Sequence, residues 1–132
     1  MSERYIKVFS GNEDLYVDDA PIMIRASALL KDTLTGKMIA QLKFQNISDN
    51  NITYIKVRIT QLDAINQQID TPIDFEYLDI LVSAKEEFGS RTPIILSNPA
   101  ARAFKVGVSC VGFSDGTVWK CENSDWVPAL ME

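Results

Sequence analysis

The fold class is decided by the stretch Met38-Ile39-Ala40-Gln41-Leu42-Lys43-Phe44-Gln45. Its even positions are all apolar, whereas Gln41, Lys43 and Gln45 are polar. Because successive side chains of a β-strand point to opposite faces of a sheet, this alternation predicts a strand with one buried face and one solvent-facing side.

Two other runs show the same alternation. Apolar residues occupy every odd position from 55 to 59 and every even position from 104 to 110, so Cys110 is expected to face the core together with Val108. Clusters of turn-forming residues separate the runs at 33–36, 48–51, 63–66 and 114–116. The predicted strands span residues 4–9, 21–31, 37–47, 52–62, 73–80, 91–96, 103–113 and 117–121. The segment 83–88 is expected to form a loop or a single helical turn.

These strands predict an all-β fold. Two antiparallel sheets would pack into an immunoglobulin- or fibronectin-like sandwich of seven to eight strands, with a closed barrel as the alternative. The chain has 132 residues and shows no repeat, linker or low-complexity tract, so residues 1–132 are expected to form a single domain. Pro21, Pro72 and Pro93 lie near predicted strand starts, where a missing amide donor disturbs a sheet least.

Four stretches resemble a family of uncharacterised bacterial proteins. They are residues 28–37 (ALLKDTLTGK), 40–48 (AQLKFQNIS), 86–89 (EEFG) and 113–119 (FSDGTVW). The family occurs mainly in Firmicutes, where the domain often precedes a zinc ribbon, and it is more distantly similar to FxLYD-type sandwich domains of bacterial envelope proteins. The resemblance spans nearly the whole chain and implies a β-sandwich interaction module of unknown ligand. It supplies no catalytic or binding residues, and this chain lacks the paired cysteines of a zinc ribbon.

Charge and hydropathy restrict the partners. The net charge is −5, and Lys and Arg are scattered singly among apolar residues. Nucleic-acid binding needs a basic stripe, so no nucleic-acid partner is expected. No apolar run approaches the roughly 20 residues that span a bilayer, and the polar start at residues 1–5 lacks the apolar core of a signal peptide. We therefore expect a cytoplasmic protein that does not associate with membranes.

Few residue types that carry enzyme chemistry are present. The sequence has no histidine, two cysteines and six isolated glycines, which argues against His-dependent nucleophiles, common zinc sites and Gly-rich phosphate loops. The acids near Pro72 could serve a Ca²⁺ site or a glycosidase; they are Asp70, Asp74, Glu76 and Asp79. Their spacing fits no calcium loop, so we interpret them as a solvated face. The sequence predicts a non-enzymatic protein with no cofactor and no metal.

Three aromatic residues are the candidate ligand-binding residues: Trp119, Trp126 and Tyr77. Together with Phe75 they could form a flat platform that stacks on a sugar or a peptide. Such a platform would make the chain a carbohydrate- or small-ligand-binding sandwich. In the alternative, Trp119 plugs the end of the core and Trp126 pins the C-terminal tail.

Cys110 and Cys121 flank the predicted turn at 114–116. If Asp115 and Gly116 form a two-residue turn, the two cysteines lie directly opposite each other on one face. If residues 114–116 form a three-residue loop with a left-handed Gly116, the register slips by one position and the thiols point to opposite faces. We expect reduced thiols, as in most cytoplasmic proteins.

The N-terminal strand 4–9 is apolar on both faces, with Tyr5 and Phe9 on one and Ile6 and Val8 on the other. A terminal strand of a small sandwich tends to be an edge, whose unpaired backbone groups accept another strand. The sequence thus predicts a module that binds an unknown protein or peptide, and a homodimer through this edge strand is one form of it. In the alternative, tail residues 126–130 cover the strand.

Overall fold

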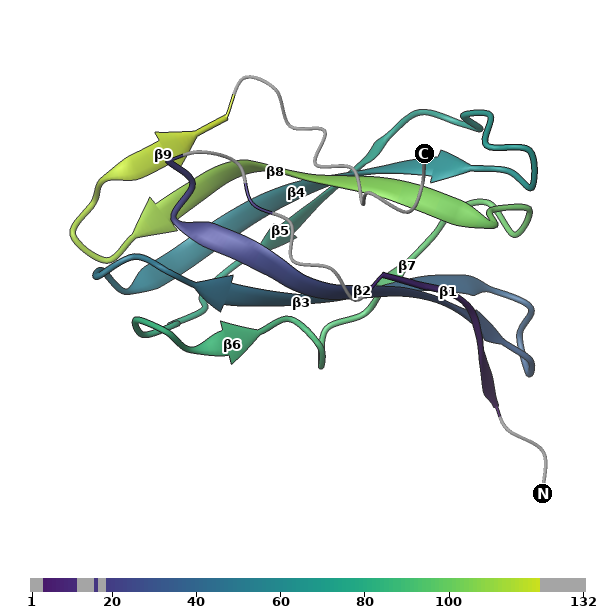
Figure 1. Ribbon diagram of the computed structural model, residues 1–132, viewed down its shortest axis with the longest axis horizontal. Coiled ribbons are helices and arrows are strands. Elements are labelled where there is room, and N and C mark those ends of the chain that lie inside the picture. Colours follow the sequence, from purple (N-terminus) through teal and green to yellow (C-terminus); the bar gives the residue numbers. More distant parts are fainter. Residues whose placement is uncertain (1–3, 12–15, 17–18, 122–132) are drawn as a thin grey trace.

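The computed structural model describes residues 4–11, 16 and 19–121, and these residues form two β-sheets packed face to face (Figure 1). Every pair of strands in both sheets is antiparallel. The strands of the described residues are β1 (Tyr5–Gly11), β2 (Ile22–Asp32), β3 (Met38–Asn46), β4 (Ile52–Leu62), β5 (Ile73–Tyr77), β6 (Glu87–Phe88), β7 (Ile94–Ile95), β8 (Ala103–Phe113) and β9 (Val118–Lys120). This architecture confirms the predicted all-β, two-sheet sandwich.

The first sheet has the strand order β1-β2-β3-β6, with β7 also paired to β3, and the second has the order β5-β4-β8-β9. The chain crosses between the sheets after β3, returns after β5, and crosses again after β7 (Figure 1). β3 therefore lies between β2 and β7, and β4 lies between β5 and β8, which is the pairing pattern of an immunoglobulin-like sandwich. The strands outnumber the seven or eight expected because residues 87–88, predicted as loop, form β6.

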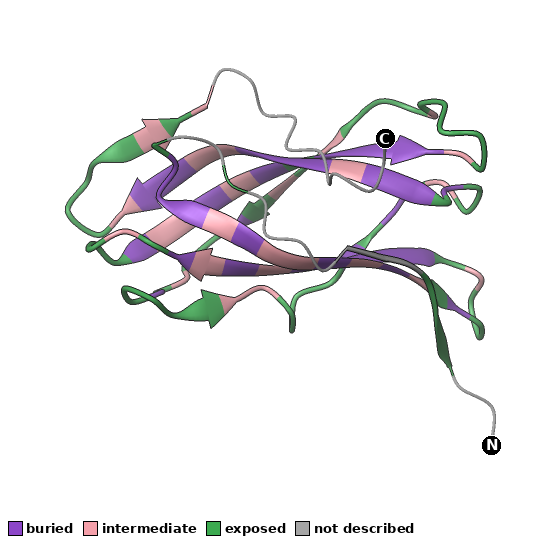
Figure 2. Cartoon of the chain, in the orientation of Figure 1, coloured by how far each residue is buried: buried purple, intermediate pink, exposed green. Residues whose placement is uncertain are grey.

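The core lies between the sheets and follows the alternation of the sequence (Figure 2). Six side chains predicted to point inward are each at most 1% exposed: Leu42, Phe44, Val57, Ile59, Val106 and Val108. The polar residues that alternate with them on β3, Gln41, Lys43 and Gln45, keep contact with solvent. Full burial of one large apolar side chain contributes about 1.5–3 kcal/mol, so this interleaved layer is the main source of stability.

A β-bulge in β8 corrects one prediction. Lys56 pairs with Cys110 and Val57 pairs with Val108, so Ser109 has no partner on β4. An extra residue of this kind shifts the in-and-out alternation by one position. Val111 consequently enters the core at 0% exposure, and Cys110 lies half-buried on the outer face with Lys56. The expectation that Cys110 faces the core is therefore wrong.

Proline positions mark three strand starts. Pro21, Pro72 and Pro93 each stand directly before the first residue of β2, β5 and β7. A residue without an amide hydrogen cannot donate to a sheet ladder, and at a strand start this loss disturbs no interior pair. The predicted strand 73–80 ends earlier, at Tyr77, because Asp79 has a φ of 55°, which lies outside the β region.

Candidate functional site

Tyr77 does not belong to a surface platform. It lies at the end of β5, is 4% exposed, and its ring contacts Phe44 edge-on at 5.7 Å between centroids. The rings of Phe75 and Phe88 complete the cluster, with centroids 5.0 Å and 6.1 Å from that of Tyr77. Burial raises the pKa of the Tyr77 hydroxyl, which has no hydrogen-bond partner among the described residues. The prediction that Tyr77 is an exposed ligand-binding residue is wrong, because its strand turns it inward.

Trp119 does not complete an exposed platform with Tyr77. Trp119 lies in β9, opposite Val111 of β8, and its half-buried side chain packs against the core. This position agrees with the alternative in which Trp119 closes the end of the core. Trp126 lies outside the described residues. The two candidates within the described residues, Trp119 and Tyr77, therefore do not form a flat, exposed surface.

The acids of β5 form a solvated face, as expected. Asp74 and Glu76 are both exposed and stand opposite Arg58 and Lys56 of β4. Arg58 Nε donates to Asp74 Oδ1 at 2.9 Å, which lowers the pKa of Asp74. The Tyr54 hydroxyl donates to Glu76 Oε2 at 2.6 Å, and this bond raises the pKa of Tyr54 to about 12. Among the residues that the structure describes, no group of three or more acids and cysteines could hold a metal ion.

The register of the β8–β9 hairpin places Cys110 and Cys121 on opposite faces of the sheet. Gly112 pairs with Val118 and Cys110 with Lys120, so the turn is a three-residue loop at 114–116. Gly116 has a φ of 89°, the left-handed conformation that this loop requires. Because Cys121 follows Lys120, its side chain points to the face opposite to that of Cys110. The second of the two registers considered above is therefore the observed one.

The feature that stands out is the edge strand β1. Residues 4–8 are all exposed, including Tyr5 at 45%, Ile6 at 49% and Val8 at 40% (Figure 2). All strands of nine or more residues lie between two neighbours, and the other edge strands, β5, β6, β7 and β9, have at most five residues. On the side away from β2, β1 has no neighbouring strand in the part of the chain that is described.

The open side of β1 presents backbone groups at known positions. The Thr33 amide donates to the Arg4 carbonyl at 2.7 Å, so Arg4 directs its backbone toward the β2 side. Antiparallel strands alternate between residues that bond to the neighbour and residues that do not. Tyr5 and Lys7 therefore turn their amide and carbonyl groups toward the open side. A β-bulge between Lys7 and Phe9 ends this regular segment.

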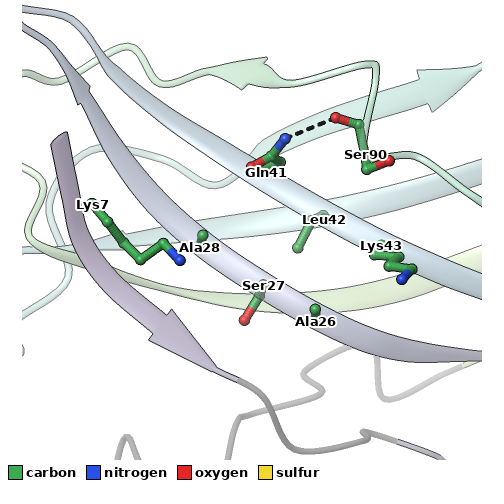
Figure 3. Close-up of a pocket in the computed structure, with 8 residues that line it drawn as sticks. All are labelled: Lys7, Ala26, Ser27, Ala28, Gln41, Leu42, Lys43 and Ser90. Carbon is green, nitrogen blue, oxygen red and sulfur yellow. Dashed lines mark hydrogen bonds between the residues drawn. The ribbon is translucent and has the colours of Figure 1, made fainter. Parts of the chain in front are cut away.

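A shallow groove lies beside β1 on the outer face of the first sheet (Figure 3). It has a volume of about 210 Å³, and its walls come from β1, β2, β3 and the segment after β6. It is lined by Lys7, Ala26, Ser27, Ala28, Gln41, Leu42, Lys43 and Ser90. Gln41 Nε2 donates to the Ser90 carbonyl at 2.9 Å and so fixes the segment after β6 over β3. The run Ala26-Ser27-Ala28 was the available sequence signal for this hollow, since small side chains leave space on a sheet.

Comparisons with protein-family models, with curated proteins and with solved structures gave no match. No helix of the described residues is long and apolar enough to cross a bilayer.

Proposed function

We propose that this protein is a non-enzymatic interaction module that binds an extended segment of a partner polypeptide as an added strand on β1. The observation that carries the proposal is the seven-residue edge strand β1, whose first four residues, 5–8, are all exposed. An unpaired strand edge offers a row of amide and carbonyl groups, and a partner strand that pairs with them gains main-chain hydrogen bonds.

The surroundings of β1 suit a peptide better than they suit a sugar. Tyr5 and the bulged Val8 offer exposed apolar surface beside the open backbone groups, and alternate side chains of an added strand would contact such surface. A sugar platform needs flat exposed aromatic rings, and Tyr77 lies in the core. Proteins usually protect long edges with charges or with very short strands, whereas β1 has a single charged residue, Lys7, between Tyr5 and Val8.

The test uses a displayed library of random peptides, from which binders are selected and then synthesised for affinity measurements. Two variants at one position form the matched pair. Lys7→Pro removes the amide hydrogen that faces the open side, and that amide is not part of the β1–β2 ladder. Lys7→Ala removes the same ammonium group but keeps the amide hydrogen.

We expect the selected peptides to lose at least about tenfold in affinity with Lys7→Pro relative to Lys7→Ala, a difference of about 1.4 kcal/mol. Thermal melts of both variants would show that the fold is retained. Equal affinities for the two variants, or a library that yields no binders, would contradict strand addition at β1.

A further inference from the structure

The groove on the outer face of the first sheet combines small residues with positive charge. Ala26 and Ala28 of β2 form its floor, and Lys7 reaches over it from β1 (Figure 3). Lys43 borders it from β3. Ser27 also borders the groove, but it pairs with the core residue Leu42, so its side chain faces the inner side of the sheet.

The charges of the groove are not balanced by its own residues. Lys43 Nζ lies 3.1 Å from Glu87 Oε1, so this ammonium group has a counter-ion on the neighbouring strand. Lys7 has no ion pair with any described residue, and no acid lines the groove itself. Among the described residues the groove therefore keeps one positive charge without a counter-ion, in a protein whose net charge is −5.

A second hollow continues the groove along β3. It has a volume of about 450 Å³, shares Lys43 and Ser90 with the first, and carries Arg91 on its wall. Lys7 thus lines the first hollow, Arg91 lines the second, and Lys43, which is paired with Glu87, lines both. Two adjoining hollows with cations on their walls are complementary to a chain that carries several carboxylates, and together they exceed what one small acid needs.

We propose that this basic groove binds the side-chain carboxylates of an acidic segment of the partner polypeptide, with Lys7, Lys43 and Arg91 as the charged contacts. The inference rests on the proposed function, because the acidic segment belongs to the same partner that pairs with β1. A carboxylate peptide fits better than a nucleic acid, because three cations with Glu87 among them do not form the continuous basic stripe that a phosphate backbone requires.

The test measures binding of hexaglutamate amide to the full chain by ¹⁵N-resolved NMR titration. We expect shifts at residues 26–28 and 41–43 that weaken with added salt, as screening of exposed charges requires. Lys7→Gln and Lys43→Gln should each weaken binding about threefold, and the double variant about tenfold, in line with exposed ion pairs. Lys31→Gln, the matched control, removes an exposed charge of β2 that does not line the groove and should leave binding unchanged.

Two further ligands, glutarate and a single-stranded oligonucleotide, and one further variant decide between ligand classes. Glutarate alone should bind far more weakly than hexaglutamate, and Ala28→Gln, which fills the groove without a charge, should weaken hexaglutamate binding. Tighter binding of a single-stranded oligonucleotide than of hexaglutamate would overturn the inference, as would equal effects of Lys7→Gln and Lys31→Gln.

If Lys7→Pro abolishes binding of library peptides while Lys7→Gln and Lys43→Gln leave it intact, the groove inference fails and strand addition stands. If hexaglutamate binds at the groove while Lys7→Pro and Lys7→Ala bind library peptides equally, strand addition fails and so does a common partner.

Discussion

Arg4 and Asp32 form a two-bond ion pair that ties the start of β1 to the end of β2. Arg4 Nε donates to Asp32 Oδ1 at 3.2 Å, and Nη2 donates to Oδ2 at 3.1 Å. The Arg4 side chain is 52% exposed, whereas that of Asp32 is 6% exposed and also accepts the Leu34 amide of the following turn. The strand proposed to receive a partner is therefore held in register with β2 by the ion pair of Arg4, the residue directly before β1.

This pair predicts a loss of stability in acid. The bond from Arg4 lowers the pKa of Asp32 to about 2, below the value of about 3.9 expected in the unfolded chain. A depressed pKa contributes stability that is present above pH 4 and is lost as the pH falls toward 2. In thermal melts, Asp32→Asn should lower the melting temperature at neutral pH, and the gap to the wild type should shrink between about pH 4 and pH 2.

The Asn variant retains an oxygen acceptor for the Leu34 amide, so the comparison isolates the ion pair. A gap that stays constant across this pH range would show that Asp32 acts through the turn and not through Arg4.

Two glycines with positive φ provide a matched test of packing beside the groove. Gly89 has a φ of 100°, and an added Cβ would stand 2.8 Å from Phe44 Cδ2 and 3.0 Å from the Leu42 carbonyl oxygen. Gly36 has a φ of 77° and nothing within 4 Å of the same position. We expect Gly36→Ala to cost about 1–2 kcal/mol of unfolding free energy from backbone strain alone. Gly89→Ala should cost clearly more in urea titrations, since overpacking adds about 1–3 kcal/mol. Equal costs would place Phe44 away from the segment after β6.

The buried hydroxyl of Tyr77 predicts that its removal, unlike the glycine substitutions, does not lower the free energy of unfolding. Its oxygen has no hydrogen-bond partner among the described residues, and the ring packs among Phe44, Phe75 and Phe88. An unsatisfied buried donor costs about 1–3 kcal/mol. Tyr77→Phe should therefore leave the free energy of unfolding unchanged or raise it by about 1 kcal/mol. A clear destabilisation in urea titrations would reveal a partner for this hydroxyl and reopen the question of a ligand there.

How far the sequence predicts this molecule depends on whether a feature is local. The alternation on β3 and β4 is local and predicts the inward faces correctly. Tyr77 was predictable on the same ground, since Ile73, Phe75 and Tyr77 alternate with the two acids of β5. The bulge at Ser109 has no residue signature, because Ser is unremarkable in a strand, so the reversal at Cys110 was not predictable. The run of small residues at 26–28 signals only the β2 part of the groove, because its other walls come from β1, β3 and the segment after β6, and no single stretch encodes how these meet.

The acids of β5 should not bind calcium. Both oxygens of Asp74 face Arg58, at 2.9 Å and 3.4 Å, and the Glu76 carboxylate accepts the Tyr54 hydroxyl. A ligand that binds only the folded state raises the melting temperature. We expect millimolar CaCl₂ to leave the melting temperature where an equal ionic strength of NaCl leaves it. A rise specific to Ca²⁺ that disappears in Asp74→Asn would identify a metal site at β5.

A second copy of the chain is the competing occupant of the β1 edge. Antiparallel pairing of two β1 strands about a two-fold axis would place Tyr5 and Lys7 of one copy opposite Tyr5 or Lys7 of the other. The two Lys7 ammonium groups and the two Arg4 guanidinium groups would then lie at facing or nearby positions, and like charges across a strand pair are destabilising. Arg4 is already paired with Asp32, so Lys7 carries most of this repulsion.

Sedimentation velocity over a wide dilution range should therefore show a monomer of 14.8 kDa at physiological salt. The decisive condition is high salt, where the Debye length falls to about 3 Å at 1 M and the repulsion is screened. A dimer that appears only there, and that Lys7→Pro removes, would show that charge alone keeps the edge free for a partner of opposite sign. A dimer at physiological salt that Lys7→Pro abolishes would contradict the prediction, because the edge would then already be used by self-association.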